Sequence, residues 1–187
     1  MAVPIPHWAW QIASSELAVE LPRRWAHTQG VARTAVVLAD RLGGDTELLA
    51  AAAVLHDVGY APRLASTGFH PLDGARFLRD EHQIDQRVVR LVANHTCALL
   101  EAEERGLHEQ LATEFPAHDD PLLTDALIYC DMTTTPDGTP TTPGERIGEI
   151  VSRYGPDSVV GRFIRRAEPE ILSATSRIEA LLPTQPR

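Results

Sequence analysis

Apolar residues recur every three to four positions along most of this chain, and that spacing limits what it can fold into more than any other feature. Such a period places one apolar stripe along each helix. Runs of β-branched residues that alternate with polar ones, which a half-buried strand requires, are nearly absent. The pattern therefore predicts an all-α fold, a bundle of helices.

Proline, glycine and capping residues divide the pattern into separate helices. We expect helices at about 14–20, 22–42, 47–58, 70–82, 85–95, 119–132 and 143–154, and one or two more across 158–182. The segment 97–115 has an irregular helical pattern, whereas 133–144 is rich in Thr, Pro and Gly and is expected to be a loop. Thr142, Pro143 and Glu145 predict a capping box where the loop meets the next helix.

A length of 187 residues is enough for one helical domain and short for two. We therefore predict a single domain across 1–187, with its core at about 22–132 and C-terminal helices within 143–182. Cys97 and Cys130 are too few for a secreted disulfide framework, and no segment has the pattern of a transmembrane helix or a signal peptide. These features favour a cytoplasmic protein with no membrane partner.

The charge of the chain bears on its partners. The net charge is −9, and all 17 basic residues are arginine. The sequence has no basic stripe or tail, so duplex nucleic acid is not expected as a partner. A small anionic substrate stays compatible with this charge, because bound metal ions can reverse the local field. The sequence leaves open whether the protein forms a homodimer.

Several His and Asp side chains continue the apolar stripes of the predicted helices, where a polar group needs a partner to offset its burial. His95, for example, follows Leu91 by four residues and Val92 by three. The residues in such positions are His27, His56, Asp57, His95 and Asp131. Imidazole nitrogen and carboxylate oxygen together suit divalent Fe, Mn, Co, Ni or Zn, and no thiolate cluster points to a structural zinc site. The stripes therefore predict a metal site of the hydrolytic kind.

The adjacent pair His56 and Asp57 adds to this prediction. Neighbouring side chains on a helix diverge by about a hundred degrees, so the pair can hold two ions with the carboxylate between them. Taken singly, each candidate has a simpler interpretation as a core histidine, a helix cap or a surface acid. His70, directly before Pro71, could replace a helix cap.

The order His, His-Asp, His, His, Asp resembles that of the HD superfamily of metal-dependent phosphohydrolases. The resemblance extends from Arg23 to Met132, through the strings RRWAHTQGV, AAAVLHDVGYAP, FHPLDGARFL, ANHT and ALIYCDM. It is greatest for the dinuclear branch of the superfamily, which includes bacterial symmetrical dinucleoside-tetraphosphate hydrolases. That likeness implies that two divalent metal ions are bound.

The resemblance also implies a role for each ligand. One ion would be surrounded by His27, His56, Asp57 and Asp131. Asp57 would bridge to a second ion that His70 and His95 complete, with a water or hydroxide between the two metals. His56 and Asp57 would then be the catalytic residues.

The reaction implied is hydrolysis of a phosphate ester or anhydride in a nucleotide or another small phosphorylated metabolite, with the metal-bridging hydroxide as nucleophile. The enzyme would be a phosphomonoesterase, a phosphodiesterase or a nucleotide pyrophosphohydrolase. The candidates for binding the substrate are Arg24, Tyr60, Arg63 and Arg146. Tyr60 stands where many dinuclear relatives have Lys, and a phenol can donate a hydrogen bond but brings no positive charge.

Two other functions remain as alternatives. One is a non-catalytic signalling module that binds a nucleotide in the same pocket, and the other is a di-iron HD oxygenase. The threonine-rich loop at 133–144 leaves the helix of Asp131 beside the expected metals, so it is either a lid over the substrate or an ordinary connection.

Overall fold

The structure is a computed structural model that describes residues 5–43 and 45–182. These residues form helices and no β-strand, apart from an isolated bridge between Thr134 and Pro140. The α-helices are α1 (His7–Leu17), α2 (Pro22–Leu42), α3 (Thr46–Leu55), α4 (His70–Asp80), α5 (Gln86–Asn94), α6 (Ala98–Arg105), α7 (His108–Glu114), α8 (Pro121–Met132), α9 (Pro143–Tyr154) and α10 (Val159–Leu181). Short 3-10 helices are η1 (Val58–Tyr60), η2 (Pro62–Leu64) and η3 (His95–Cys97). The all-α prediction is confirmed.

The ends of the helices are set by the residue types that usually set them. Proline occupies the first turn of α2, α4, α8 and α9. Asp45 and Asp85 cap α3 and α5 with their side chains. The capping box predicted at α9 is present, because Thr142 and Glu145 bond each other's backbone N–H groups.

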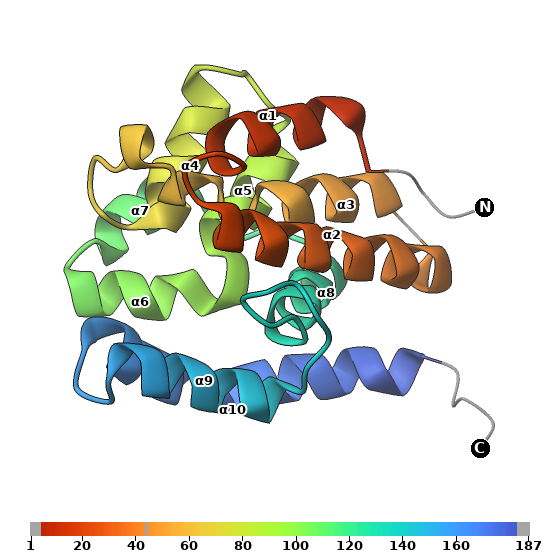
Figure 1. Ribbon diagram of the computed structural model, residues 1–187, viewed down its shortest axis with the longest axis vertical. Coiled ribbons are helices and arrows are strands. Elements are labelled where there is room, and N and C mark those ends of the chain that lie inside the picture. The colour runs from red at the N-terminus through yellow and green to blue at the C-terminus, as the bar shows by residue number, and fades with distance from the viewer. Residues whose placement is uncertain (1–4, 44, 183–187) are drawn as a thin grey trace.

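The helices pack in two parts that share α8. In Figure 1, α9 and α10 lie along one side of the molecule, below α6 and α8, while α1 to α5 lie above. The larger buried cluster is built mainly by α1, α2, α3, α4, α5 and α8. Residues 50–53 of the alanine-rich α3 are buried within this part, where small side chains allow close packing against α2. A second cluster joins α8 to α9 and α10 through Met132, Ile147, Phe163 and Ile164.

Three predicted helix boundaries were wrong, and two of them matter for function. The first helix lies at His7–Leu17 and not at 14–20, because Ala9, Ala13 and Leu17 form its buried stripe after Pro6. The helix expected at 47–58 ends at Leu55, so the His-Asp pair lies in the turn after it. The helix expected to reach residue 95 ends at Asn94, and His95 begins a 3-10 turn.

The remaining boundaries are close to those expected. The irregular segment 97–115 is divided between α6 and α7 by Gly106, which has a left-handed backbone conformation (φ 70°). The segment 158–182 forms a single helix, α10. Within the part of the chain that the structure describes, no helix combines the length and the apolar character needed to cross a membrane.

Candidate metal centre

Two buried histidines are oriented by the backbone immediately before them. His56 Nδ1 lies 2.8 Å from the carbonyl oxygen of Ala53, and His95 Nδ1 lies 2.6 Å from that of Val92. A carbonyl oxygen only accepts hydrogen bonds, so in both rings Nδ1 is the donor. Each ring therefore presents Nε2 to the interior, the arrangement typical of a metal ligand held by an outer hydrogen bond.

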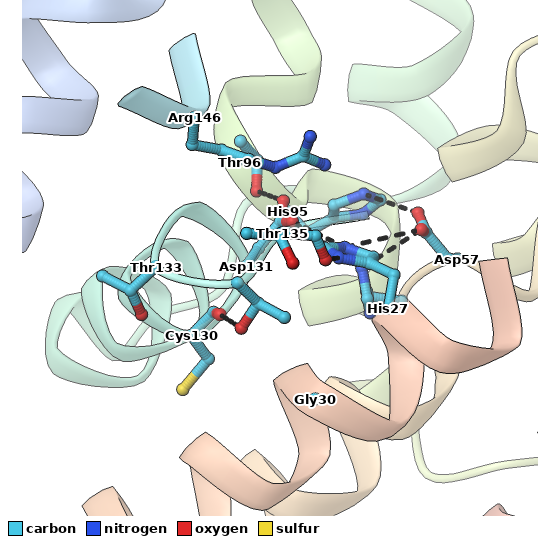
Figure 2. A network of polar contacts seen from close by, with 12 residues as sticks. His27, Gly30, Asp57, His95, Thr96, Cys130, Asp131, Thr133, Thr135 and Arg146 are labelled. Carbon is cyan, nitrogen blue, oxygen red and sulfur yellow. Dashed lines mark hydrogen bonds and ion pairs between the residues drawn. The ribbon is translucent and has the colours of Figure 1, made fainter. Parts of the chain in front are cut away.

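His27 is oriented in the same way by a distant segment. Its Nδ1 donates to the carbonyl oxygen of Thr135, in the loop after α8, over 3.0 Å. Its Nε2 then lies 3.1 Å from an Oδ1 atom of Asp131. Figure 2 shows His27 next to both Asp131 and Thr135. The residue from α2 is thus held between the end of α8 and the loop.

Asp57 lies between two pairs of histidines. Its Oδ2 atom is 3.4 Å from His56 Nε2 and 3.9 Å from His27 Nε2. Its Oδ1 atom is 3.4 Å from His70 Nε2 and 3.9 Å from His95 Nε2. The two groups, each with ligand atoms close enough to hold one metal ion, therefore share this carboxylate. A carboxylate with one oxygen toward each group is what two neighbouring ions would need as a bridge.

The close approach of α4 to the His-Asp turn makes this arrangement possible. A Cβ atom on Gly59 would lie 2.0 Å from the carbonyl oxygen of His70 and 2.6 Å from the amide nitrogen of Gly74. Only glycine fits at such a contact. The contact places His70, the first residue of α4, beside Asp57.

Asp131 lies beside the first group, at the end of α8. Its Oδ1 atom lies 3.1 Å from His27 Nε2 and 4.0 Å from His56 Nε2. Its other oxygen accepts a hydrogen bond from the hydroxyl of Thr96. Thr96 and Cys97 both have left-handed backbone conformations (φ 46° and 61°), which are costly for residues with a side chain. The strained turn after His95 thus brings the Thr96 hydroxyl to the site.

The protonation states of these candidate ligands follow from burial and from the neighbouring charged groups. Burial holds the pKa of His70 well below its usual value and lowers that of His95, so both rings are neutral at pH 7. Burial also opposes a charge on His56, but Asp57 and Asp131 outweigh it and raise the pKa of His56 to about 8. Burial would raise the pKa of Asp57, yet His56 and Arg24 hold it well below its ordinary range.

The donor set fits divalent metal ions. His56 Nε2 is buried and has no hydrogen-bond partner, and a buried polar atom of this kind is costly unless it binds something. Neutral imidazoles and ionised carboxylates are the ligands that Fe, Mn, Co, Ni and Zn accept. The structure therefore brings together the six residues that the sequence predicts as ligands, which are His27, His56, Asp57, His70, His95 and Asp131.

Arg24 and Tyr60 form a stack on one side of these residues. Arg24 Nη1 donates to Asp57 Oδ2 over 2.7 Å, and its guanidinium lies 3.8 Å from the centre of the Tyr60 ring. The Tyr60 ring in turn stacks on His70, with centroids 3.9 Å apart. Burial raises the pKa of Tyr60, so its phenol stays protonated. The Tyr60 ring therefore lies between the guanidinium of Arg24 and the imidazole of His70.

A cleft beside the ligands, which we call the metal cleft, separates them from the C-terminal helices. Asp57, His70, His95 and Asp131 line one wall, and residues of α9 and α10 that include Ile150 and Phe163 line the other. Arg24, Tyr60 and Arg146 also line the cleft. Figure 2 shows the Arg146 side chain beside Thr96.

The fourth substrate-binding candidate, Arg63, is not brought to this site. Its guanidinium bonds the carboxylate of Glu16 over 2.7 and 2.8 Å, and Glu81 lies 3.5 Å away. The side chain is half exposed. It follows Asp57 by only six residues, but η1 and η2 turn the chain toward the surface between the two.

Two residues of the site were missed by sequence reasoning. Thr96, which bonds Asp131, directly follows His95, and Arg153 lines the cleft from α9. A signal existed for Arg153, which follows Arg146 by seven residues and so lies on the same face of the helix two turns later. Thr96 ends the string ANHT, but apolar periodicity gives it no role, because its position depends on a strained backbone.

The threonine-rich loop is folded against α2. Thr135 N–H donates to the Thr139 carbonyl oxygen over 2.8 Å, and Thr141 N–H donates to that of Thr133 over 2.9 Å. Arg33, on α2, donates to the carbonyl oxygen of Gly138 over 2.9 Å. These bonds make the loop a fixed support for His27, which argues against an open lid.

Comparisons with known proteins find a family model and curated relatives that match parts of this chain. The family model described as "HD domain" matches residues 24–132, more than half of the chain. A tRNA (cytidine(56)-2'-O)-methyltransferase of Picrophilus torridus is 36% identical over 103 residues, which are 54% of this chain and 28% of that protein. A ribonuclease Y of Rubrobacter xylanophilus is 39% identical over 70 residues, which are 37% of this chain and 13% of that protein. The chain thus spans less than a third of each relative, and no solved structure matches it.

Proposed function

Because this chain belongs to the HD domain family, we propose that it is a metal-dependent phosphohydrolase with a dinuclear centre. Its substrate would be a nucleotide or another small phosphorylated metabolite, cleaved at a phosphate ester or anhydride. The dinuclear branch of the superfamily, rather than its mononuclear members, provides the best comparison. His70 and His95 are the residues that make the difference, since they supply the second group of ligands.

The observation that carries this proposal is the position of Asp57. Each of its two oxygens lies 3.4 to 3.9 Å from two histidine Nε2 atoms. A single ion bound to one of these oxygens could not also bind all four histidine rings. The carboxylate is ionised, and two of the four histidines, His70 and His95, have depressed pKa values. This charge state suits two divalent ions.

In this proposal, each residue of the site binds either a metal ion or the substrate. His27, His56 and Asp131 would hold one ion, His70 and His95 the other, and Asp57 both. Bound divalent ions would acidify a water molecule as nucleophile and neutralise charge on the phosphate oxygens. Arg24 and Arg146 would bind oxygens that the metals do not reach and stabilise the charge that develops on them.

Elemental analysis and a phosphate-release screen test this proposal together. Protein purified without chelator is expected to contain up to two divalent ions per chain and to release phosphate from at least one nucleotide, dinucleotide or phosphorylated metabolite. The variant Asp57→Asn should lose both properties, whereas Asp157→Asn, at an exposed position that does not line the metal cleft, should keep them.

Two outcomes would overturn the proposal. Tight nucleotide binding without any turnover would indicate a signalling module. Oxygen consumption by an iron-loaded protein that releases no phosphate would indicate an oxygenase.

A further inference from the structure

The metal cleft continues into a second hollow on the side of α2, which we call the arginine hollow. Four arginines line it: Arg23, Arg24, Arg146 and Arg153. Three of them, Arg24, Arg146 and Arg153, also line the metal cleft, so the two spaces meet at these side chains. His27 and Pro136 complete the boundary toward the ligands and the loop.

The charge of this hollow is opposite to that of the protein. The chain carries 26 acidic and 17 basic residues, yet among the described residues that line the hollow Glu20 is the sole acid beside four arginines. A concave surface lined by one sign of charge concentrates the field and attracts ions of the other sign. The hollow therefore suits an anion on a protein whose surface is otherwise acidic.

Two of the four arginines share one acidic partner, whereas Arg23 bonds Asp137 and Arg24 bonds Asp57. Arg153 Nε lies 3.2 Å from a carboxylate oxygen of Glu149, and Arg146 bonds the other oxygen of the same residue. One carboxylate thus serves two guanidinium groups. Arg146 is 5% exposed, and its Nε atom is buried without a hydrogen-bond partner. A buried donor of this kind is costly unless a ligand supplies the acceptor.

We propose that the arginine hollow binds a second phosphate group of the substrate, one that is not hydrolysed. This inference rests on the proposed function, because the reacting phosphate would lie at the metals in the adjoining cleft. Arg24, Arg146 and Arg153 stand between the two phosphates and can donate to either. The organic part of the substrate would lie against the apolar wall formed by Ile150 and Phe163. The substrate class is then an organic compound with two phosphate groups.

Phosphate binding by the metal-free protein tests the hollow without any turnover. Titration calorimetry with inorganic phosphate should detect binding that Arg153→Gln weakens about tenfold, the usual effect of losing a charge-assisted hydrogen bond. The side chain of Arg153 is 30% exposed, so its replacement should leave the fold intact. The control is Arg165→Gln, because Arg165 lines neither space and donates to the backbone carbonyl of Pro156. Equal affinity in the Arg153 variant, or no phosphate binding by the wild type, overturns the proposal.

Kinetics of the metal-loaded protein test whether the second phosphate belongs to the substrate. Adenosine 5′-monophosphate is compared with adenosine 5′-diphosphate and adenosine 3′,5′-bisphosphate. We expect kcat/KM to favour one of the two-phosphate compounds about tenfold or more, and Arg153→Gln to remove most of that preference. Activation of monophosphate hydrolysis by free phosphate would instead indicate an effector site and overturn the assignment. If no compound releases phosphate, the proposed function fails, while phosphate binding by the metal-free protein still decides whether the hollow is an anion site.

Discussion

The two oxygens of Asp57 face different pairs of histidines. This side chain therefore belongs to both groups of ligands in the proposed metal centre. Asp57→Ala should therefore lose both metal ions. His95→Ala removes a ligand of one group and should lose mainly the second ion. Metal content measured by mass spectrometry on protein dialysed against a metal buffer tests this difference, with Asp157→Ala as the control. Loss of a single ion from the Asp57 variant would contradict a bridging role.

The raised pKa of His56 predicts a pH dependence for metal binding. A pKa of about 8 means that the metal-free protein carries a proton on this ring below pH 8, and that proton must leave before Nε2 can bind a metal. His70 and His95 have lowered pKa values and compete little in this range. The dissociation constant should fall about tenfold per pH unit between pH 6.5 and 8 and then level off. Competition with a chromophoric chelator measures it, and a flat profile over this range would contradict the prediction.

At the scale of the element, the contact between α2 and the loop at 133–142 is expected to control metal binding. A Cβ on the buried Gly30 would lie 2.6 Å from the carbonyl oxygen of Gly138 and from the methyl of Thr134. Gly30→Ala should therefore push the loop away and weaken its bond to His27, lowering metal affinity by about 10- to 100-fold and stability by about 1–3 kcal/mol.

The chain offers a matched control for this variant. Gly148 lies on the exposed face of α9, and nothing is within 4 Å of a Cβ built there. Gly148→Ala should stabilise the protein by up to about 1 kcal/mol through helix propensity, with no change in metal affinity. Wild-type metal affinity in Gly30→Ala would show that the loop does not support His27.

A shortened loop distinguishes two possible roles of this segment, support for His27 and a lid over the substrate. Removal of residues between Thr134 and Thr141 deletes the Thr135 carbonyl that orients His27, so metal content should fall. A lid would behave differently, because its loss should leave metal content unchanged and alter KM or substrate choice. Metal analysis of the shortened variant, with circular dichroism to verify its helicity, distinguishes the two.

At the scale of the whole molecule, metal binding should stabilise the fold, because the ligands come from α2, from the turn after α3, from α4, from η3 and from α8. A metal present at a hundred times its dissociation constant adds about 2.7 kcal/mol, and for a chain of this size each kcal/mol raises the Tm by about 2–4 °C. A chelator should thus lower the Tm by about 5–10 °C. The melting temperature of Asp57→Asn should not respond to the chelator, and an equal response from both proteins would contradict a shared site.

What could be read from the sequence is what depends on local spacing. Apolar periodicity predicts the all-α fold, and the positions of His27, His95 and Asp131 on apolar stripes predict that they point inward. The capping box at α9 was predictable for the same reason, since all its bonds join residues three apart. The ends of α3 and α5 were not, because tertiary contacts determine where those helices stop.

Only the tertiary structure decided which inward groups meet. His27 and Asp131 are 104 residues apart, and the loop carbonyl that orients His27 belongs to the backbone, which has no signature in the sequence. The sequence also does not show which arginines reach the site. Arg63 follows the His-Asp pair closely in the sequence, yet it bonds Glu16 at the surface. Arg153, almost a hundred residues from Asp57, faces the site because α9 packs across the cleft from α4. Local periodicity determines the direction of a side chain relative to its own helix, whereas the packing of helices determines its neighbours.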